Sequence, residues 1–210
     1  MNHSPSRLSL FDFELSGHCH RVRLMMSLLG LPFDTTAVDL GSGEHKRAPF
    51  LGMNPFGQVP VLRDGDVTIS DSTAILIYLV SKFGGERWLP LDPAKAADVQ
   101  RWLSVASGEM AFGLAQARAA VLFGFPYDVA AATRLAHALL QQMDQHLTDA
   151  QFLCGSTATV ADVACYSYTA HAPEGRISLD AYPHVRAWVA RVEALPRFVP
   201  MPRTPVPAAA

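Results

Sequence analysis

The segment Gln58-Val59-Pro60 constrains the fold of this chain more than any other, because a proline there follows a short apolar strand and a second strand comes after it. Proline has no backbone N–H, and the bond before it is the one that can readily be cis. If Val59-Pro60 is cis, the N–H and C=O of Val59 turn outward and can pair with an extended ligand as one more strand would. The segment therefore predicts a binding edge for a small peptide.

The pair Asp71-Ser72, which opens a predicted helix, supplies the other end of that site. The Ser72 hydroxyl and the first amides of the helix form a receptor for a carboxylate, and Asp71 can face an ammonium group. A ligand with backbone amides in its middle and an amino-acid head at one end satisfies both motifs. Glutathione is such a ligand.

Composition narrows the class of protein. Half of the 210 residues are apolar, 17% are charged and the net charge is −2, so the chain can bury a sizeable core in one large or two small domains. Lys and Arg are scattered without a basic run, which supports neither nucleic-acid binding nor membrane-surface binding. The longest aliphatic stretch, residues 74–80, is far shorter than the roughly 18 residues that span a bilayer.

The N-terminal residues and the cysteines predict a cytoplasmic setting. Residues 1–7 are polar, and no apolar signal-peptide region follows them. The three cysteines, Cys19, Cys154 and Cys165, show neither a C-x-x-C motif nor metal-ligand spacing. No metal is therefore expected, and a reducing compartment is the natural inference.

Residues 1–83 alternate strand and helix signals, which predicts a small α/β domain. Apolar residues spaced from Val22 to Leu29 mark one helix face, and Asp64-Gly65 marks a tight hairpin turn. The predicted elements, in the order βαβαββα, are strand 8–13, a helix ending at Gly30, strand 33–38, a short helix at 48–53, strands 59–62 and 67–69, and helix 71–83.

Residues 84–92, rich in glycine and proline, predict a linker, and residues 93–210 predict an all-helical domain. Every periodic segment after the linker has helical spacing, and Thr159 with Asp162 fits a helix-start box. The prolines from Pro200 onward predict an extended or disordered tail.

Together these signals resemble the glutathione transferase family, in order and over nearly the whole chain. The segments that carry the resemblance are Ser16 to Leu24, His45-Lys46 ahead of Asn54-Pro55, Gln58-Val59-Pro60, Asp71-Ser72, and Thr159 to Asp162 with Tyr182-Pro183 later on. The chain is most similar to bacterial Ser-type members, near the theta, zeta and nu-like classes. The resemblance implies a thioredoxin-like α/β N-terminal domain, an all-α C-terminal domain, glutathione as cosubstrate, a role in detoxification and a homodimer.

Ser16 stands between the first strand and the first helix, where a hydroxyl can donate to a thiolate and the positive end of the helix assists. Such surroundings bring the pKa of a thiol from about 8.5 to roughly 6–7, which corresponds to about 2–3 kcal/mol. In Ser-type members the serine at this place does that work, so the resemblance implies that Ser16 is catalytic. The alternative is that Ser16 only caps the helix.

Cys19 and His18 leave alternatives open. A cysteine near a helix N-terminus with basic neighbours can have a lowered pKa and bind glutathione as a mixed disulfide, as cysteine-type members do. Its place in the first helical turn favours instead a buried, small, apolar side chain. His18 stands where related bacterial sequences often carry Asn. It either donates to the thiolate when protonated or is simply solvated.

The resemblance also implies binding roles for the other site residues. A basic residue after the glycine-rich loop meets the glycine carboxylate of glutathione, which points to His45 and Lys46, and Gln58 contacts the same end. Val59 pairs with the cysteinyl backbone, and Pro60 is a cis proline that serves both fold and binding. The acid–serine pair described above holds the γ-glutamyl head.

The sequence hardly encodes the second substrate. The implied fold places it between the small domain and the first long helix of the large one, near Trp102, Val105, Glu109 and Phe112, although core packing explains Trp102 better. The expected reaction is attack of the glutathione thiolate on a hydrophobic electrophile. A glutathione-dependent disulfide or peroxide reductase and a non-catalytic binding domain of the same fold are the alternatives.

Overall fold

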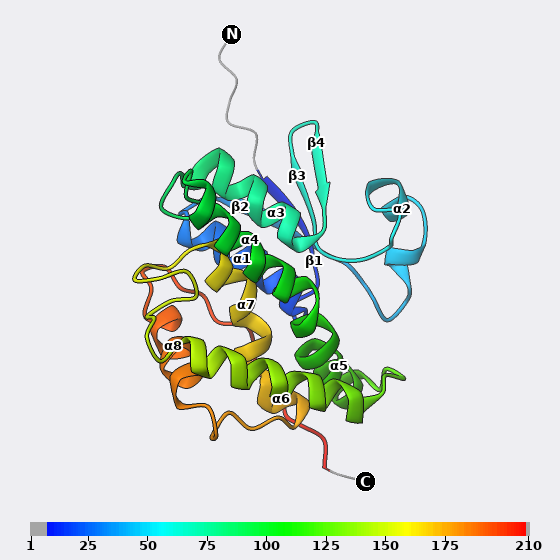
Figure 1. Cartoon of the computed structure of the whole chain (residues 1–210). Helices are drawn as coiled ribbons and strands as arrows, with labels where there is room; N and C mark the ends of the chain where they lie inside the picture. The colour runs from blue at the N-terminus through cyan, green and yellow to red at the C-terminus, as the bar shows by residue number, and fades with distance from the viewer. Residues whose placement is uncertain (1–7, 209–210) are drawn as a thin grey trace.

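The computed structural model describes residues 8–208, so the prediction about residues 1–7 lies outside the described residues. It opens with a four-stranded mixed sheet in the order β2-β1-β3-β4. β1 (Leu8–Asp12) pairs in parallel with β2 (Phe33–Ala37) and antiparallel with β3 (Val61–Asp64). β3 pairs antiparallel with β4 (Val67–Ser70) through the predicted Asp-Gly turn. Figure 1 shows the sheet in the upper part of the molecule, with the helical part below it.

Three helices accompany the sheet and complete the predicted βαβαββα order. α1 (Gly17–Leu28) connects the parallel strands, the short α2 (Phe50–Met53) comes before β3, and α3 (Ser72–Leu79) follows β4. The side chains of Leu24 and Met25 on α1 are fully buried. This arrangement confirms the thioredoxin-like N-terminal fold.

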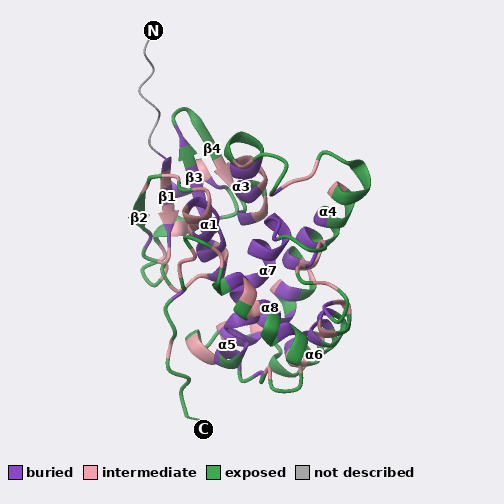
Figure 2. Ribbon diagram, turned by 90° about the vertical axis from the view of Figure 1, so that its left-hand side faces the viewer, coloured by how far each residue is buried: buried purple, intermediate pink, exposed green. Residues whose placement is uncertain are grey.

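The rest of the described chain is helical, as predicted. Its helices are α4 (Pro93–Ser107), α5 (Gln116–Phe123), α6 (Val129–His146), α7 (Val160–Ala170) and α8 (Pro183–Glu193). Every residue of α7 is buried, and Figure 2 shows this helix at the centre of the molecule. Because α7 packs against both α1 and α4, it joins the α/β part to the helical part through one continuous core.

The start of α7 is fixed by the predicted box. Thr159 accepts the amide of Ala161, and the Asp162 carboxylate accepts the amide of Thr159. Asp162 also accepts the amide of Leu153 and the indole N–H of Trp188, at 2.9 and 2.8 Å. A buried carboxylate with this many donors is a structural group, which agrees with the prediction.

Some predicted boundaries were wrong. The strand expected at 59–62 begins at Val61, so Val59 lies in the loop before it. The helix expected at 71–83 ends at Leu79 and continues as a π-helical segment, Val80–Gly84. Trp88, inside the predicted linker, is buried, and its carbonyl accepts the amide of Val160. Glycine and proline composition therefore indicated a segment between two helices. It did not indicate that this segment packs against the core.

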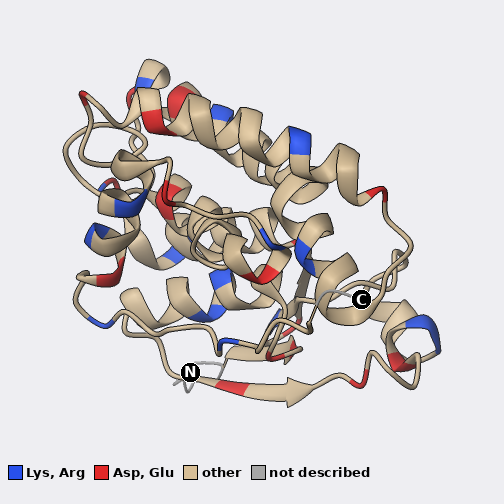
Figure 3. Ribbon diagram, turned by 90° about the horizontal axis from the view of Figure 1, so that it is seen from below, with Lys and Arg blue, Asp and Glu red and all other residues tan. Residues whose placement is uncertain are grey.

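The C-terminal tail is extended, and parts of it are held against the helical part. Met201 is buried, and the amide of Thr204 donates to Glu174 at 3.0 Å. Charged residues of both signs are spread along the described chain (Figure 3). Within residues 8–208, no helix combines the length and apolar character needed to cross a membrane.

Candidate functional site

A cavity of about 590 Å³ opens at the end of β1, between the start of α1 and the segment formed by η3 (Ala111–Ala115) and α5. The predicted site residues that line it are Ser16, His18 and Gln58. A larger groove of about 840 Å³ lies between β2 and the C-terminal tail, and none of the predicted site residues lines it. The smaller cavity is therefore the candidate site.

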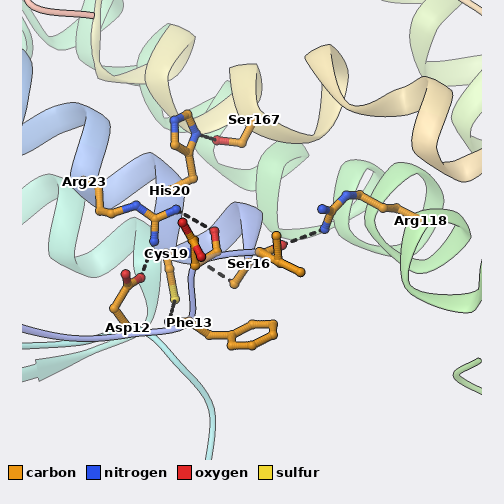
Figure 4. Close-up of polar contacts among 10 residues, drawn as sticks. Asp12, Phe13, Ser16, Cys19, His20, Arg23, Arg118 and Ser167 are labelled. Carbon is orange, nitrogen blue, oxygen red and sulfur yellow. Dashed lines mark hydrogen bonds and ion pairs between the residues drawn. The ribbon is translucent and has the colours of Figure 1, made fainter. Parts of the chain in front are cut away.

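Ser16 is the N-cap of α1 and faces this cavity. Its Oγ accepts the backbone amide of Cys19 at 3.3 Å, as Figure 4 shows. An N-cap oxygen uses a lone pair in that bond, so the hydroxyl hydrogen stays available to another acceptor. The capping interpretation and the catalytic interpretation of Ser16 are thus compatible in one geometry.

Cys19, three residues further along α1, points into the protein. Its side chain is fully buried, and its sulfur accepts the amide of Phe13 at 3.4 Å (Figure 4). Burial first, and then the nearby Asp12 carboxylate, raise the pKa of the Cys19 thiol to about 12. A thiol that is protonated and inaccessible is a poor nucleophile. The buried apolar alternative for Cys19 matches this geometry, whereas a mixed disulfide with glutathione does not.

His18 matches neither alternative drawn from the sequence. Its ring lies against Tyr168, with the ring centroids 5.0 Å apart, and its Nδ1 is 3.4 Å from the Ser72 Oγ. Burial first, and then the positive charge of Arg21, lower the pKa of His18 to about 3. The imidazole is therefore neutral at physiological pH, and it bridges the two ends of the candidate site instead of projecting into solvent.

Ser72 and Asp71 stand at the start of α3. Asp71 caps that helix by accepting the amides of Thr73 and Ala74, both at 2.9 Å, and its φ is +72°. A non-glycine residue with positive φ costs about 1–3 kcal/mol, and such residues cluster at functional sites. Burial alone would raise the pKa of Asp71, but the hydrogen bonds from Thr73 and Ala74 outweigh it and lower the pKa. Asp71 is therefore ionised at neutral pH, next to Ser72 at the start of α3.

Arg21, which the sequence interpretation missed as a site residue, lies directly behind Ser72. Its side chain is fully buried, and its Nη1 donates to the Ser72 Oγ at 3.4 Å. Its Nε and Nη2 have no hydrogen-bond partner among the described residues. Burial lowers the pKa of Arg21, and the negative charge of Asp71 acts in the opposite direction, so Asp71 partly compensates this buried cation. The sequence does contain a sign that Arg21 is special, because this charged residue lies on the helix face that also carries the buried Leu24 and Met25.

Of the Gln58-Val59-Pro60 segment, Gln58 lines the cavity. Val59-Pro60 is cis, as expected, and neither the amide nor the carbonyl of Val59 has a hydrogen-bond partner in the described part of the chain. The side chain of Gln58 is exposed at the cavity. The backbone carbonyl of Gln58 accepts a hydrogen bond from the side-chain amide of Asn54 at 2.7 Å. An extended ligand can therefore pair with the backbone of Val59.

His45 and Lys46 lie beside this segment but do not line the cavity. Their loop packs against Gly57, where an added Cβ would lie 2.7 Å from the His45 carbonyl oxygen. The Lys46 Nζ donates to the carbonyl of Phe56 at 3.1 Å, and the buried Nδ1 of His45 has no partner among the described residues. The Lys46 side chain also lies beside Gly57, the residue before Gln58.

Aromatic rings form the wall of the cavity in the helical part. Phe13 contacts Phe123 edge-on at 6.4 Å, Phe123 contacts Phe125 at 6.5 Å, and Phe125 stacks on Tyr127 at 5.8 Å between centroids. The expected position of the second substrate stays a prediction. Phe112 lines the cavity, but Trp102 is buried in the core away from it. The wall lies further along the chain because η3 and α5 turn toward the sheet.

Two further residues join the helical part to the start of α1, and the sequence interpretation missed both. Tyr168 of α7 lies so close to α1 that a Cβ on Gly17 would be 2.7 Å from its ring. Arg118 of α5 donates from Nη1 to the Leu15 carbonyl at 2.7 Å (Figure 4). Both residues line the cavity. Within the described residues, no group of three or more His, Cys, Asp and Glu is arranged to hold a metal.

Comparison with known proteins gives a consistent result. Residues 15–82 match the family model "Glutathione S-transferase, N-terminal domain", and residues 121–196 match "Glutathione S-transferase, C-terminal domain". The chain is 33% identical to glutathione S-transferase 3 of Zea mays over 216 residues, covering 94% of this chain and 97% of the relative.

Solved structures agree with the sequence matches. A glutathione S-transferase from Pseudomonas fluorescens superposes with a TM-score of 0.89 at 33% identity, covering 93% of this chain and 99% of that one. A glutathione transferase homologue from Drosophila mojavensis, solved with bound glutathione, superposes with a TM-score of 0.81 at 29% identity, covering 90% and 89%. With its thioredoxin-like sheet, its helical second part and these matches, the chain belongs to the glutathione S-transferase family.

Proposed function

We propose that this glutathione transferase binds glutathione between Ser16 and Ser72 and transfers the whole glutathionyl group, through its sulfur, to a planar aromatic electrophile. The observation that carries the proposal is the orientation of Ser16, which caps α1 and still faces the cavity. In the reaction a carbon–sulfur bond forms between the thiolate and the electrophile, and the leaving group departs with its electron pair. The thiol proton goes to solvent before the attack.

Ser16 stabilises the thiolate in this proposal. Its Oγ already accepts the Cys19 amide, so its hydrogen is free to donate to the sulfur. The positive end of the α1 dipole adds to the stabilisation. Cys19 has a packing role, since its side chain is fully buried.

The amino-acid head of glutathione binds at the start of α3. Its carboxylate accepts from the hydroxyl and the amide of Ser72, with the Arg21 cation behind Ser72. Its ammonium group faces the Asp71 carboxylate. The relative from Drosophila mojavensis was solved with bound glutathione, which supports the choice of ligand.

The rest of the peptide lies along the cis-proline segment. The cysteinyl backbone pairs with the free amide and carbonyl of Val59, next to the cis Pro60. The glycine carboxylate lies at the other end, near Gln58, His45 and Lys46. Lys46 is a cation within reach of that end, because its Nζ is 3.1 Å from the Phe56 carbonyl oxygen.

The electrophile class follows from the aromatic wall. Phe13, Phe123, Phe125 and Tyr127 contact one another in sequence along the cavity. Aromatic pairs contribute about 0.5–1.5 kcal/mol beyond the area they bury, so a flat aromatic substrate gains more here than an alkyl chain of equal hydrophobicity.

We further propose a homodimer in a reducing compartment such as the cytoplasm. Phe56 and Leu91 expose 79% and 75% of their side chains, and a second copy of the chain would cover such surfaces. All three cysteines are free thiols. Sedimentation at two protein concentrations tests the dimer, and a single monomer mass at both would contradict it.

Calorimetry with glutathione, followed by turnover assays, tests the function. We expect wild-type protein to bind glutathione and Ser72→Ala to bind it roughly 10- to 100-fold more weakly, since a hydrogen bond to a charged group contributes about 1.5–3 kcal/mol. Ser81→Ala, an exposed serine outside the site, is the matched control. An aryl halide should be turned over faster than a small mixed disulfide. Faster turnover of the disulfide would indicate a reductase, and absence of glutathione binding would indicate a non-catalytic protein.

A further inference from the structure

Arg118 is a buried cation in contact with the segment that presents Ser16. It lies on α5, in the helical part, and only 2% of its surface is exposed. Its Nη1 donates to the carbonyl oxygen of Leu15, the residue directly before Ser16, at 2.7 Å (Figure 4). A hydrogen bond from a charged donor is among the stronger hydrogen bonds in proteins, and this one is partly buried.

The guanidinium of Arg118 is itself fixed. Its Nε donates to the Glu174 Oε2 at 2.6 Å, and both side chains of this ion pair are almost completely buried. The other oxygen of Glu174 accepts from His171 at 2.8 Å and from the amide of Thr204 at 3.0 Å. The backbone of α5 also packs closely against Gly175, because an added Cβ on Gly175 would lie 2.9 Å from the backbone nitrogen of Arg118.

The peptide unit between Leu15 and Ser16 is therefore held from both sides. Its carbonyl accepts from Arg118, and its N–H, which belongs to Ser16, donates to the Phe13 carbonyl at 2.9 Å. Rotation of this unit would move the Ser16 Oγ. Misplacement of a catalytic group by about 1 Å can cost roughly 100-fold in rate.

We propose that Arg118, held by Glu174, is a positioning residue that sets the direction in which Ser16 presents its hydroxyl to the glutathione sulfur. This inference rests on the proposed function of Ser16. It makes the catalytic loop depend on the helical part and, through Glu174 and Thr204, on the C-terminal tail. The helical part then contributes to activation of the cosubstrate as well as to binding of the electrophile.

The test compares Arg118→Met, Arg118→Lys and Glu174→Gln with a variant that loses a remote hydrogen bond. Tyr166→Phe serves as that control, because it removes the 2.8 Å bond to Glu193 outside the cavity. For each variant we would measure kcat, KM for glutathione, the pKa of bound glutathione by thiolate absorbance, and the melting temperature.

We expect Arg118→Met to lower kcat by roughly 10- to 100-fold and to raise the pKa of bound glutathione, with KM for glutathione changed less than about twofold. Arg118→Lys should restore part of kcat, and Glu174→Gln should show a smaller shift in the same direction. Tyr166→Phe should change only the melting temperature.

Two outcomes would overturn the proposal. One is a folded Arg118→Met protein with wild-type kcat and wild-type thiol pKa. The other, if Arg118→Met does not fold, is a folded Glu174→Gln protein that keeps both values. Ser16→Ala, measured alongside, separates the two claims. If Ser16→Ala leaves the pKa of bound glutathione unchanged, the proposed role of Ser16 is wrong. If Ser16→Ala raises this pKa and Arg118→Met does not, only the positioning role of Arg118 is contradicted.

Discussion

Ser16 and Cys19 lie three residues apart at the start of one helix, and they differ in their exposure to the cavity. Ser16 faces the cavity, while Cys19 is buried with its pKa raised to about 12. The sequence predicted both as candidates because each residue type near a helix N-terminus can stabilise or become a thiolate. It could not choose between them, because which side of the first turn faces the core depends on how α1 packs against the sheet and α7.

Replacement of Cys19 tests its assignment to packing. Cys19→Ala should keep kcat for an aryl halide within about threefold of wild type, and its cost should appear as roughly 1 kcal/mol of stability, a typical value for a single substitution. Steady-state kinetics and denaturant unfolding measure the two effects. A folded Cys19→Ala protein without activity would show that the sulfur takes part in the reaction.

Phe125 reports on the electrophile. In Phe125→Leu the stacked contact with Tyr127 is lost, so the preference for a benzyl halide over an alkyl halide of matched hydrophobicity should fall by roughly 2- to 10-fold. The ratio of the two kcat/KM values measures this preference, and KM for glutathione is the internal control. An unchanged ratio would mean that the aromatic wall does not contact the substrate.

At the level of elements, the order of strands and helices was predictable because apolar periodicity and turn residues are local signals. The contacts that complete the site were not. Arg21, Arg118 and Tyr168 come from α1, α5 and α7, and they meet only because these helices pack together. Local patterns do not specify which helix faces which, so residues that act across a helix–helix contact were missed.

Gly17 tests the contact between α1 and α7. Gly17→Ala would place a Cβ 2.7 Å from the Tyr168 ring, and overpacking of this kind costs about 1–3 kcal/mol. Gly52→Ala is the matched control, since a Cβ there meets nothing within 4 Å. In a Tyr168→Leu background the cost of Gly17→Ala should shrink, as measured by denaturant unfolding. Strictly additive costs would contradict the contact.

For the whole molecule, one continuous core runs from the sheet through α7 into the helical part. Composition predicted that such a core could exist, and the match to two domain models agrees with the division into an α/β part and a helical part. The exact boundary at residues 84–92 stays a prediction. The core also buries neutral histidines, which makes stability depend on pH.

His20 should make the protein less stable in mild acid. Its ring is fully buried between Ser167 and the Val199 carbonyl, and burial lowers its pKa to about 4 from an unfolded value of 6.5. Between these values the unfolded chain takes up a proton that the folded chain does not. The free energy of unfolding should therefore decrease as the pH is lowered below 6.5. For this residue the decrease is at most about 1.4 kcal/mol per pH unit.

Denaturant unfolding of wild type and His20→Gln at several values between pH 7 and pH 5 measures that contribution. The variant should show a shallower loss of stability on the acid side, because it lacks the buried group that takes up the proton on unfolding. His18, also neutral when folded, acts in the same direction and should remain in the variant. Parallel pH profiles for the two proteins would contradict the assignment.

The most direct test of the central claim is a titration of the thiolate absorbance of bound glutathione in wild type, Ser16→Ala and Cys19→Ala. Asp92→Ala, which removes the N-cap of α4 outside the candidate cavity, controls for the loss of a helix cap. We predict that Ser16→Ala raises the pKa of bound glutathione by about 1–2 units, because a hydrogen bond to a charged group contributes about 1.5–3 kcal/mol. Cys19→Ala and Asp92→Ala should leave the pKa at the wild-type value. An unchanged pKa in Ser16→Ala, or a raised pKa in Cys19→Ala, would contradict the proposal that Ser16 is the residue that stabilises the thiolate.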